Sequence, residues 1–526
     1  MLTQYTSIDL LLFALYGLLL AVSGWYFNRK AATTSDYFLG GNAMPIWMVA
    51  ISVLATSQSA ATFLGGPDQG YRGNLTYLAS NLGAFIAAFF VARFLIPRFY
   101  ALNVYTVYEL LENRFGESAK QQAGLMYLFG RVFASGARLY MAALAVAMIL
   151  FGNIDASSVI SATLLISIIG LVYSVYGGIR TVIYSDVMQA ITYVSAAVAV
   201  IIALWLAIPA DFNTVIQALQ SPADGPSKLL LFDTRTDFSP GGVFTLLSVF
   251  TGFVLLNIAA FGLDQDMTQR VLTCKNAQEG AKAMLLSVVM VIPVMLLFII
   301  IGLLLYIYYQ RPDIMSMSSG APVPEFAGEP VTIFMYYVLT DLPAGLKGLV
   351  TIGILAAALS TLNSGLNSMS SVLIQDLYRP WKLKRHASCA EEHFVSAGRI
   401  AMAFVALALA LMACLCYYWQ QYSDTPLLQF ALGVMVFSYS GLLGVYFVTL
   451  FTQRGSPASV LAALIVGFII PLLLQPYIME WYLPESLQFS LGFTWQLVIG
   501  TLIAGVVCAI GQQTSGKTWQ EASVQC

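Results

Sequence analysis

The chain has 526 residues, of which 59% are hydrophobic and 10% are charged, and its mean hydropathy is +0.79. A soluble domain carries about 25% charged residues, so this chain lacks the polar surface that a water-soluble fold requires. Its 24 basic and 26 acidic residues give a formal net charge of −2. Because no basic stripe is available to neutralise a phosphate backbone, nucleic-acid binding is excluded. The composition predicts an integral membrane protein with many spans.

Apolar runs divide the chain into membrane spans. About 20 apolar residues cross the hydrocarbon core, and the first run has this length without the basic start of a cleaved signal peptide. The spans predicted on this criterion, about thirteen in number, cover residues 8–27, 44–65, 76–96, 121–151, 157–175, 183–207, 241–263, 283–308, 345–374, 395–418, 427–451, 457–475 and 493–511.

Basic residues in the loops predict the orientation. If the N-terminus is outside, most of them lie in cytoplasmic loops, as the positive-inside rule requires, and the odd number of spans leaves the C-terminus in the cytoplasm. The outer loops 208–240 and 309–344 are expected to form short surface helices and turns. The predicted inner residues include Arg29, Lys30, Arg98, Arg114, Lys120, Arg180, Arg270, Lys275, Lys282, Arg379, Lys382, Lys384, Arg385, Arg454 and Lys517.

Two spans contain segments that do not suit a continuous helix in lipid. The second span carries the small and polar run Ala55–Thr62, and the seventh carries Asn257 and ends in Asp264–Asp266. Small residues also serve close helix packing, which is the alternative for either segment alone. Because the two spans are five apart, they predict an inverted repeat of five helices, each copy opening with a discontinuous helix.

The ninth span carries a polar stripe. Ser360, Ser364, Asn367 and Ser371 follow the spacing i, i+4, i+7 and i+11, which places them on one helix face. Hydroxyl oxygens are neutral hard ligands that suit Na⁺, whereas back-bonding to the preceding turn is the alternative for one or two of them. The stripe predicts a sodium site.

Few charges lie at membrane depth, and such charges are commonly functional. Arg131 and Arg138 are seven residues apart on the fourth span, so they share nearly the same face, and Asp186 opens the sixth span. Asp186 could pair with an arginine or bind a cation, and the sequence leaves both roles open.

Four motifs resemble those of the sodium:solute symporter family: Ser35–Gly41, Tyr176–Ile179 with Ser185–Gln189, Asp264–Asp266 with Gln269-Arg270, and Ala356–Ser368. The resemblance implies an all-α polytopic membrane protein with a LeuT-like, inverted five-plus-five helix repeat and discontinuous helices. The repeats would occupy residues 43–207 and 241–452, the second with an inner loop at 375–394. The flanking parts would be 1–42, the outer loop 208–240 and 453–526.

The resemblance also implies ligand positions. The conserved sodium site would use the backbone carbonyls of Ala55, Gln58 and Ala357 and the hydroxyls of Ser360 and Thr361. A second sodium, present in some members, would be lined by Asp186, Ser360, Asn363 and Ser364, with asparagine standing where two-sodium members have serine. The residues expected to bind the solute are Ser57, Ser59, Thr62, Phe63, Tyr77, Asn81, Arg138, Asn257, Phe261 and Gln265.

The expected function is sodium-coupled import of a small polar solute by alternating access. Where the galactose-transporting pattern has a glutamine, an acidic residue, a tyrosine and a lysine, this chain has Thr62, Asn81, Ala260 and Val289. Arg138, Asn257 and Phe261 instead resemble the sialic acid branch, and an arginine pairs well with a carboxylate. A sugar, an acidic sugar or a carboxylate is therefore expected.

Proton coupling through Asp186 is the alternative mechanism. We expect no enzymatic activity, no cofactor, and Na⁺ as both the coupling ion and the sole bound metal. The partners expected are the solute, the sodium ion and the lipid bilayer of the inner (plasma) membrane, with the protein acting as a monomer.

Overall fold

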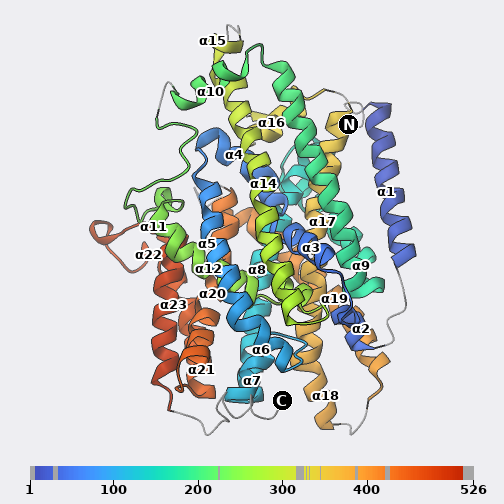
Figure 1. Cartoon of the computed structure of the whole chain (residues 1–526), viewed down its shortest axis with the longest axis vertical. Coiled ribbons are helices and arrows are strands. Elements are labelled where there is room, and N and C mark those ends of the chain that lie inside the picture. The colour runs from blue at the N-terminus through green and yellow to red at the C-terminus, as the bar shows by residue number, and fades with distance from the viewer. Residues whose placement is uncertain are drawn as a thin grey trace.

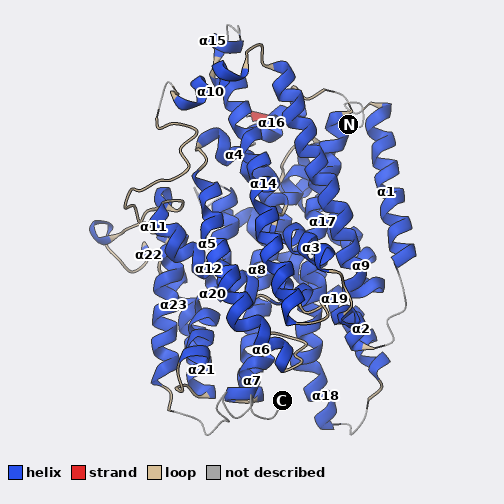
Figure 2. Cartoon of the chain, viewed as in Figure 1, coloured by secondary structure: helices blue, strands red, loops and turns tan. Residues whose placement is uncertain are grey.

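The computed structural model describes residues 6–27, 33–222, 225–315, 325–326, 329–330, 332–343, 345–385, 389–420 and 427–512. Within these ranges the chain is a bundle of long helices, and strand structure is limited to a short hairpin of β1 (Glu325–Phe326) and β2 (Glu329–Pro330). Figure 2 shows that helices account for almost all of the described chain.

The long helices follow the predicted spans and run between the two ends of the molecule (Figure 1). They are α1 (Ser7–Phe27), α3 (Ile46–Ser57) with α4 (Ala60–Arg72), α5 (Thr76–Phe90) with α6 (Ile96–Ala101), α8 (Glu117–Phe151), α9 (Ala156–Ala207), α11 (Leu246–Ser248) with α12 (Val254–Gly262) and α13 (Gln265–Val271), α14 (Ala277–Gln310), α17 (Leu346–Val372), α19 (Glu391–Gln420), α20 (Leu427–Phe451), α21 (Pro457–Leu473) and α23 (Phe493–Ile510).

Shorter helices fill the connections at both ends. They are α2 (Thr34–Leu39), α7 (Glu109–Phe115), α10 (Phe212–Gln220), α15 (Pro312–Met315), α16 (Ile333–Thr340), α18 (Arg379–Arg385) and α22 (Pro476–Met479). Short helices occur in both long loops expected outside. In the described part of these loops α10 and α15 lie at the surface, as predicted, whereas α16 is mostly buried.

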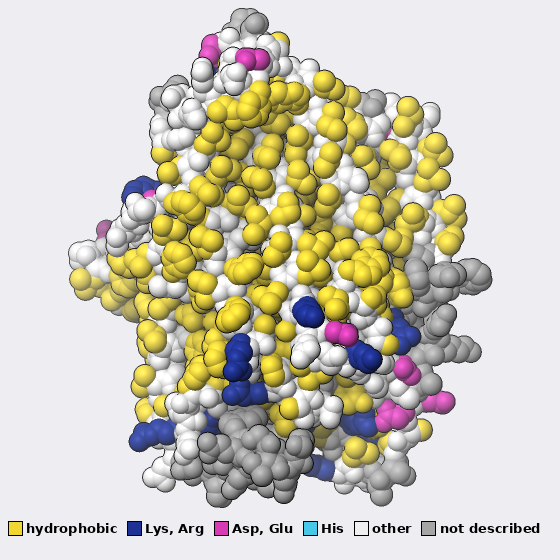
Figure 3. Space-filling view, in the orientation of Figure 1, with side chains coloured by type: hydrophobic (Ala, Val, Ile, Leu, Met, Phe, Trp, Pro, Cys, Tyr) yellow, Lys and Arg dark blue, Asp and Glu magenta, His cyan; other side chains and the backbone are white. Residues whose placement is uncertain are grey.

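By length and composition, nine described helices can cross a membrane, and two further bent pairs pass the same test together. The first and twelfth predicted spans, α1 and α21, are shorter apolar helices by that measure. Figure 3 shows a broad hydrophobic belt over the middle of the molecule, with most Lys and Arg side chains in view near the end that carries α6, α7 and α18. This distribution is that of an integral membrane protein.

The fifth and sixth spans form one helix, α9, that is kinked at Gly178. This glycine has φ 59° and ψ −166°, a conformation open to glycine and strained for other residues. A Cβ atom there would lie 2.6 Å from the carbonyl oxygen of Tyr37 in α2. The kink therefore lets α2 pack directly against α9.

The predicted break in the second span is present. Gln58 and Ser59 are extended, with ψ of 103° and 178°, and they separate α3 from α4. The Oγ atom of Ser59 caps α4 by accepting a hydrogen bond from the amide of Ala61. Because a helix end leaves carbonyls without partners in the next turn, the break supplies backbone oxygens at membrane depth.

The seventh span is also discontinuous. It contains a π-helical turn at Val249–Phe253, and α12 and α13 are separated at Leu263 and Asp264 with a bend of 57° between Leu246–Gly262 and Gln265–Val271. The carboxylate of Asp264 caps α13 through the amide of Asp266. Both spans predicted to open a repeat are thus broken helices.

The ninth span, α17, lies at the centre of the bundle. It packs against α3, α8, α9, α13 and α19, and its polar residues from Ser360 to Ser371 are buried. By contrast, α1 lies at the edge of the bundle (Figure 1), where it contacts α9 and α17. The polar stripe of α17 therefore faces protein rather than lipid.

Candidate functional site

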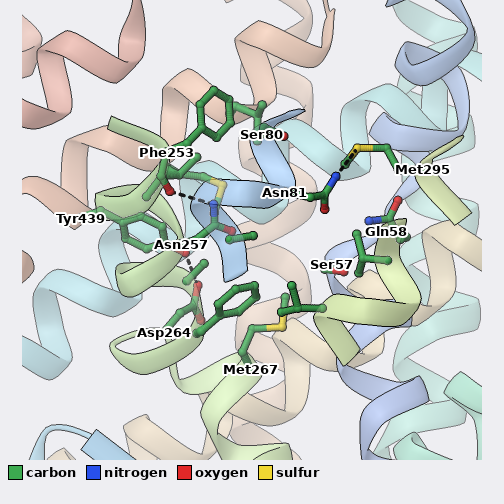
Figure 4. A pocket seen from close by; sticks show the side chains of 18 of the residues that line it. Ser57, Gln58, Ser80, Asn81, Phe253, Asn257, Asp264, Met267, Met295 and Tyr439 are labelled. Atoms are coloured by element: carbon green, nitrogen blue, oxygen red, sulfur yellow. Dashed lines mark hydrogen bonds between the residues drawn. The ribbon is translucent and has the colours of Figure 1, made fainter. Parts of the chain in front are cut away.

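A cavity with a volume of about 110 Å³ lies between the two broken helices, and residues beside each break line it. Figure 4 shows side chains from both broken helices turned toward this space. The cavity has room for several water molecules, since one water needs about 10–15 Å³. Its polar lining consists of Ser57, Gln58, Tyr77, Ser80, Asn81, Arg131, Arg138, Asn257, Asp264 and Tyr439.

Six residues expected to bind the solute line this cavity: Ser57, Tyr77, Asn81, Arg138, Asn257 and Phe261. The amide of Asn81 donates to the carbonyl of Leu78 at 2.9 Å and approaches the sulfur of Met295 at 3.1 Å. The amide of Asn257 donates to the carbonyl of Phe253 at 2.8 Å, and Figure 4 shows both amides at the cavity. Since each nitrogen is bonded within the protein, each amide offers its oxygen to a ligand.

Four residues expected to bind the solute do not line the cavity: Ser59, Thr62, Phe63 and Gln265. Ser59 serves as the cap of α4, and Thr62 lies one turn further along that helix. Phe63 packs against other aromatic rings, with centroid distances of 5.0 Å to Phe298 and 5.8 Å to Phe334.

Gln265 has a structural role in this arrangement. Its amide nitrogen donates to the carbonyl of Tyr105 at 2.8 Å, and its oxygen accepts from the amide of Val107 at 3.0 Å. Both contacts hold the segment before α7 against α13.

Val289 stands where the galactose-transporting pattern has a lysine. Its side chain is about half exposed on the outside of α14, whereas Val288 and Val291 line the cavity.

Arg138 is the cationic side chain of the cavity that lacks a carboxylate contact. Its residue is 9% exposed, Nη2 lies 3.3 Å from the sulfur of Met435, and Nη1 has no hydrogen-bond partner among the described residues. A buried guanidinium that no carboxylate contacts directly is available to pair with the anionic group of a ligand.

Arg131, seven residues earlier, is paired with two acidic groups. Its Nη1 lies 2.7 Å from Asp264, its Nη2 contacts Asp266, and the hydroxyl of Tyr439 donates to Asp264 at 2.6 Å (Figure 4). The sequence left this partnership undetected because the acids lie on a span that is distant in the chain. The two arginines of α8 thus have different surroundings on one helix face.

Arg270 extends this network toward the polar stripe, which corrects the prediction that it lies in a cytoplasmic loop. Its side chain is fully buried and lies 3.2 Å from Asp266 and 3.1 Å from Asp186. It also donates to Ser52 at 2.8 Å and contacts Ser364. The run of polar residues after Asp264 resembled a loop, whereas the neighbouring carboxylates make burial of this arginine favourable.

The residues expected at the conserved sodium site lie on the two facing helices. Ala55 lies in the last turn of α3 and Gln58 caps its end, and Gln58 Oε1 is buried with no partner among the described residues. Ala357, Ser360 and Thr361 lie within two turns of α17. Thr361 donates to the carbonyl of Ala357 at 3.2 Å. Since α3 packs against α17, the backbone oxygens of the break and the hydroxyls of α17 belong to one region.

Some of the residues expected at the second sodium site contact one another. Ser360 donates to Asp186 at 2.7 Å, and Ser364 contacts Arg270, which pairs with the same carboxylate. Asn363 lies against α9, with its Oδ1 3.3 Å from the position of a Cβ atom on Gly170. Of the two roles that the sequence left open for Asp186, the arginine partner is present, whereas cation binding stays a prediction.

Comparisons with known proteins establish the family and the fold of the chain. The sequence model of the sodium:solute symporter family matches residues 37–467. The chain belongs to the sodium:solute symporter family. It is 26% identical to the sodium/sialic acid symporter of Proteus mirabilis over 86% of this chain and 87% of that protein. It is also 29% identical to the sodium/sialic acid symporter of Aliivibrio fischeri over 70% of this chain and 69% of that protein.

A sodium/glucose cotransporter of Vibrio parahaemolyticus is 26% identical over 77% of this chain and 74% of that protein. The solved structure of a sodium-coupled sialic acid symporter in a substrate-bound outward-open state aligns with a TM-score of 0.78 at 24% identity, covering 96% and 97% of the two chains. The predicted LeuT-like, inverted-repeat fold is confirmed by this likeness. As a family member, the protein is an integral membrane transporter that couples a small solute to sodium.

Proposed function

We propose that this symporter imports a carboxylated solute, with an acidic sugar such as sialic acid as the favoured class. The observation that carries the proposal is the guanidinium of Arg138, which is buried at the cavity without a carboxylate contact. A planar guanidinium binds a carboxylate through two parallel hydrogen bonds. The two sialic acid symporters among its relatives support the same class.

The uncharged part of the cavity suits the hydroxylated part of a sugar. Ser57, Ser80, Asn81 and Asn257 lie at the cavity with Tyr77, and they can exchange hydrogen bonds with hydroxyl groups. Phe253 and Phe261 add apolar surface, as binding cavities for small molecules commonly combine a few polar groups with aromatic walls.

Sodium is proposed to bind where the break in the second span meets α17, through Ala55, Gln58, Ala357, Ser360 and Thr361. Ser57 and Gln58 also line the solute cavity. A sodium ion that orders this break would therefore order part of the solute site. Binding of either ligand would then raise the affinity for the other. Movement of one helix bundle against the other would then expose both to the cytoplasm.

We also propose that the N-terminus is outside, that the C-terminus is cytoplasmic, and that the monomer is the transport unit. The basic end of the molecule carries α7 and α18 and would be cytoplasmic (Figure 3).

Thermal stability in detergent tests the solute class. N-acetylneuraminic acid is expected to raise the melting temperature in NaCl and to have little effect in choline chloride, whereas galactose leaves it unchanged. Arg138→Met should remove the response, and Arg235→Met, on an exposed outer loop, should keep it. A response to galactose equal to that of the acidic sugar, or a full response in Arg138→Met, would contradict the proposal.

Proteoliposomes distinguish sodium from proton coupling. We expect uptake when an inward sodium gradient is present. We expect no uptake when a pH gradient is imposed in sodium-free medium. Uptake driven by the pH gradient alone would favour protonation of Asp186 and reject sodium as the coupling ion.

A further inference from the structure

The cytoplasmic half of α17 and the π-helical turn that follows it, Leu373–Tyr378, carry polar side chains that are buried and have no hydrogen-bond partner among the described residues. Asn363, Asn367 and Ser371 are 0% exposed and Gln375 is 7% exposed. Both amide atoms of Asn363 and Asn367, the hydroxyl of Ser371 and the amide nitrogen of Gln375 lack a hydrogen-bond partner in the described part of the chain. Buried polar groups are nearly always hydrogen-bonded to protein or to water, so this set requires a partner.

The unpaired groups differ from their neighbours on the same helix. Ser360, Ser364, Ser368 and Ser370 all donate hydrogen bonds, the last to the carbonyl of Gly398 at 2.7 Å. Exchanging the oxygen and nitrogen of an amide would leave Asn363 and Asn367 unpaired, because both atoms of each are without partners. The feature is therefore a property of one face of α17.

Asn363, Asn367 and Ser371 recur at every fourth position of α17, which keeps them on one side of the helix, and Gln375 follows in the π-helical turn Leu373–Tyr378. From Asn363 to Ser371 the helix rises about 12 Å, at about 1.5 Å per residue. This second stripe, formed by Asn363, Asn367, Ser371 and Gln375, begins beside Ser360, which contacts Asp186. It ends at Gln375, whose oxygen accepts from Arg379 in the polar helix α18. It thus joins the proposed sodium site to the basic end of the molecule.

The chemistry of the stripe suits passage rather than tight binding. Its amide and hydroxyl groups are neutral, so they can replace part of the hydration shell of a sodium ion without holding it by charge. The hydroxyl of Ser174 in α9, a helix that packs against α17, is also buried and has no hydrogen-bond partner in the described part of the chain. Ordered water would satisfy all these groups.

We propose that the face formed by Asn363, Asn367, Ser371 and Gln375 is a hydrated route along which sodium leaves for the cytoplasm. This inference rests on the proposed sodium site. Water bridges the four side chains between transport events, and a partly hydrated ion moves between them after the bundle opens inward.

Adjacent serines provide a matched test, because Ser371 is on the stripe and Ser370 bonds to α19. We suggest labelling S371C and S370C with a small cationic methanethiosulfonate in inside-out vesicles, with the unmodified chain as the blank for native cysteines. S371C should react at least tenfold faster than S370C. Equal rates would overturn the hydrated route.

An isosteric apolar change tests whether the route carries sodium. Asn367→Leu should lower the maximal rate of sodium-driven uptake about tenfold, with the half-saturating external sodium concentration and the melting temperature unchanged, whereas Ser370→Ala leaves the rate intact. An unchanged rate in Asn367→Leu would contradict the route. If the unmodified protein shows no sodium dependence, the proposed function fails, and the labelling comparison still decides whether the face is hydrated.

Discussion

At the scale of single residues, two arginines on one face of α8 show how surroundings determine a role. Arg131 contacts Asp264 and Asp266, whereas Arg138 lies against Met435 at the cavity. Their spacing could be read from the sequence, but the partners could not, because the acids come from a span more than a hundred residues away. The same residue type is structural at one position and is proposed to bind solute at the other.

Substituting each arginine with methionine separates these roles. Arg131→Met leaves two carboxylates buried beside each other and should destabilise the fold by about 3–5 kcal/mol. Arg138→Met removes a charge without a carboxylate contact and should retain the melting temperature. Thermal unfolding in detergent checks both, and a normal melting temperature for Arg131→Met would show that the network does not stabilise the fold.

The hydroxyls of α17 give a second residue-scale prediction. Ser360→Ala and Thr361→Ala should each raise the half-saturating sodium concentration at least tenfold, since each removes a proposed ligand. Thr351→Ala on the same helix, whose hydroxyl bonds to the carbonyl of Lys347, serves as the control. Sodium-dependent uptake measures the effect, and unchanged sodium dependence in both variants would reject the site.

At the scale of elements, the discontinuities position the chemistry. The break between α3 and α4 and the break between α12 and α13 bring Gln58 and Asp264 to one cavity. The first was predictable because Ala55–Thr62 contains small and polar residues in an otherwise apolar span. The second was predictable from Asp264–Asp266, whereas the depth of Arg270 was not, because its burial depends on tertiary partners.

Side-chain direction was less accessible from the sequence than the breaks were. Phe63 and Gln265 lie near the expected positions along their helices but point to an aromatic cluster and to the backbone before α7. Tyr439, on α20, lines the cavity and had no distinguishing signal in an apolar span. Helix rotation is set by packing, which a single sequence specifies only through periodicity.

The kink of α9 supplies a prediction about element geometry. Gly178→Ala should destabilise the protein by about 1–3 kcal/mol through backbone strain, and the clash with the carbonyl of Tyr37 adds to this cost. Gly152→Ala is the matched control, because Gly152 also has positive φ but nothing within 4 Å of its added Cβ. Equal losses of melting temperature in the two variants would show that contact between α2 and α9 is unimportant.

At the scale of the whole molecule, charge balance links the ion and the solute. Arg131, Arg138 and Arg270 are matched in number by Asp186, Asp264 and Asp266, and all six residues are at most 9% exposed. Adding one sodium ion and one carboxylate keeps this interior neutral, which avoids the cost of an unpaired buried charge. A second sodium at Asp186 would compete with Arg270 for the same carboxylate.

We therefore expect one sodium ion per monovalent carboxylate and no net charge movement. In proteoliposomes, uptake of N-acetylneuraminic acid should respond to the sodium gradient and remain unchanged when a potassium diffusion potential is imposed. Stimulation by an inside-negative potential would instead indicate at least two sodium ions per solute.

The central claim, sodium-driven import of a carboxylated solute through Arg138, is tested most directly by one uptake measurement. Radiolabelled N-acetylneuraminic acid is supplied to proteoliposomes of the unmodified chain and of Arg138→Met, with sodium or choline outside. We predict accumulation in the unmodified protein with sodium alone and a reduction of at least a hundredfold in the variant. Equal accumulation in choline, or full activity of Arg138→Met, would contradict the account.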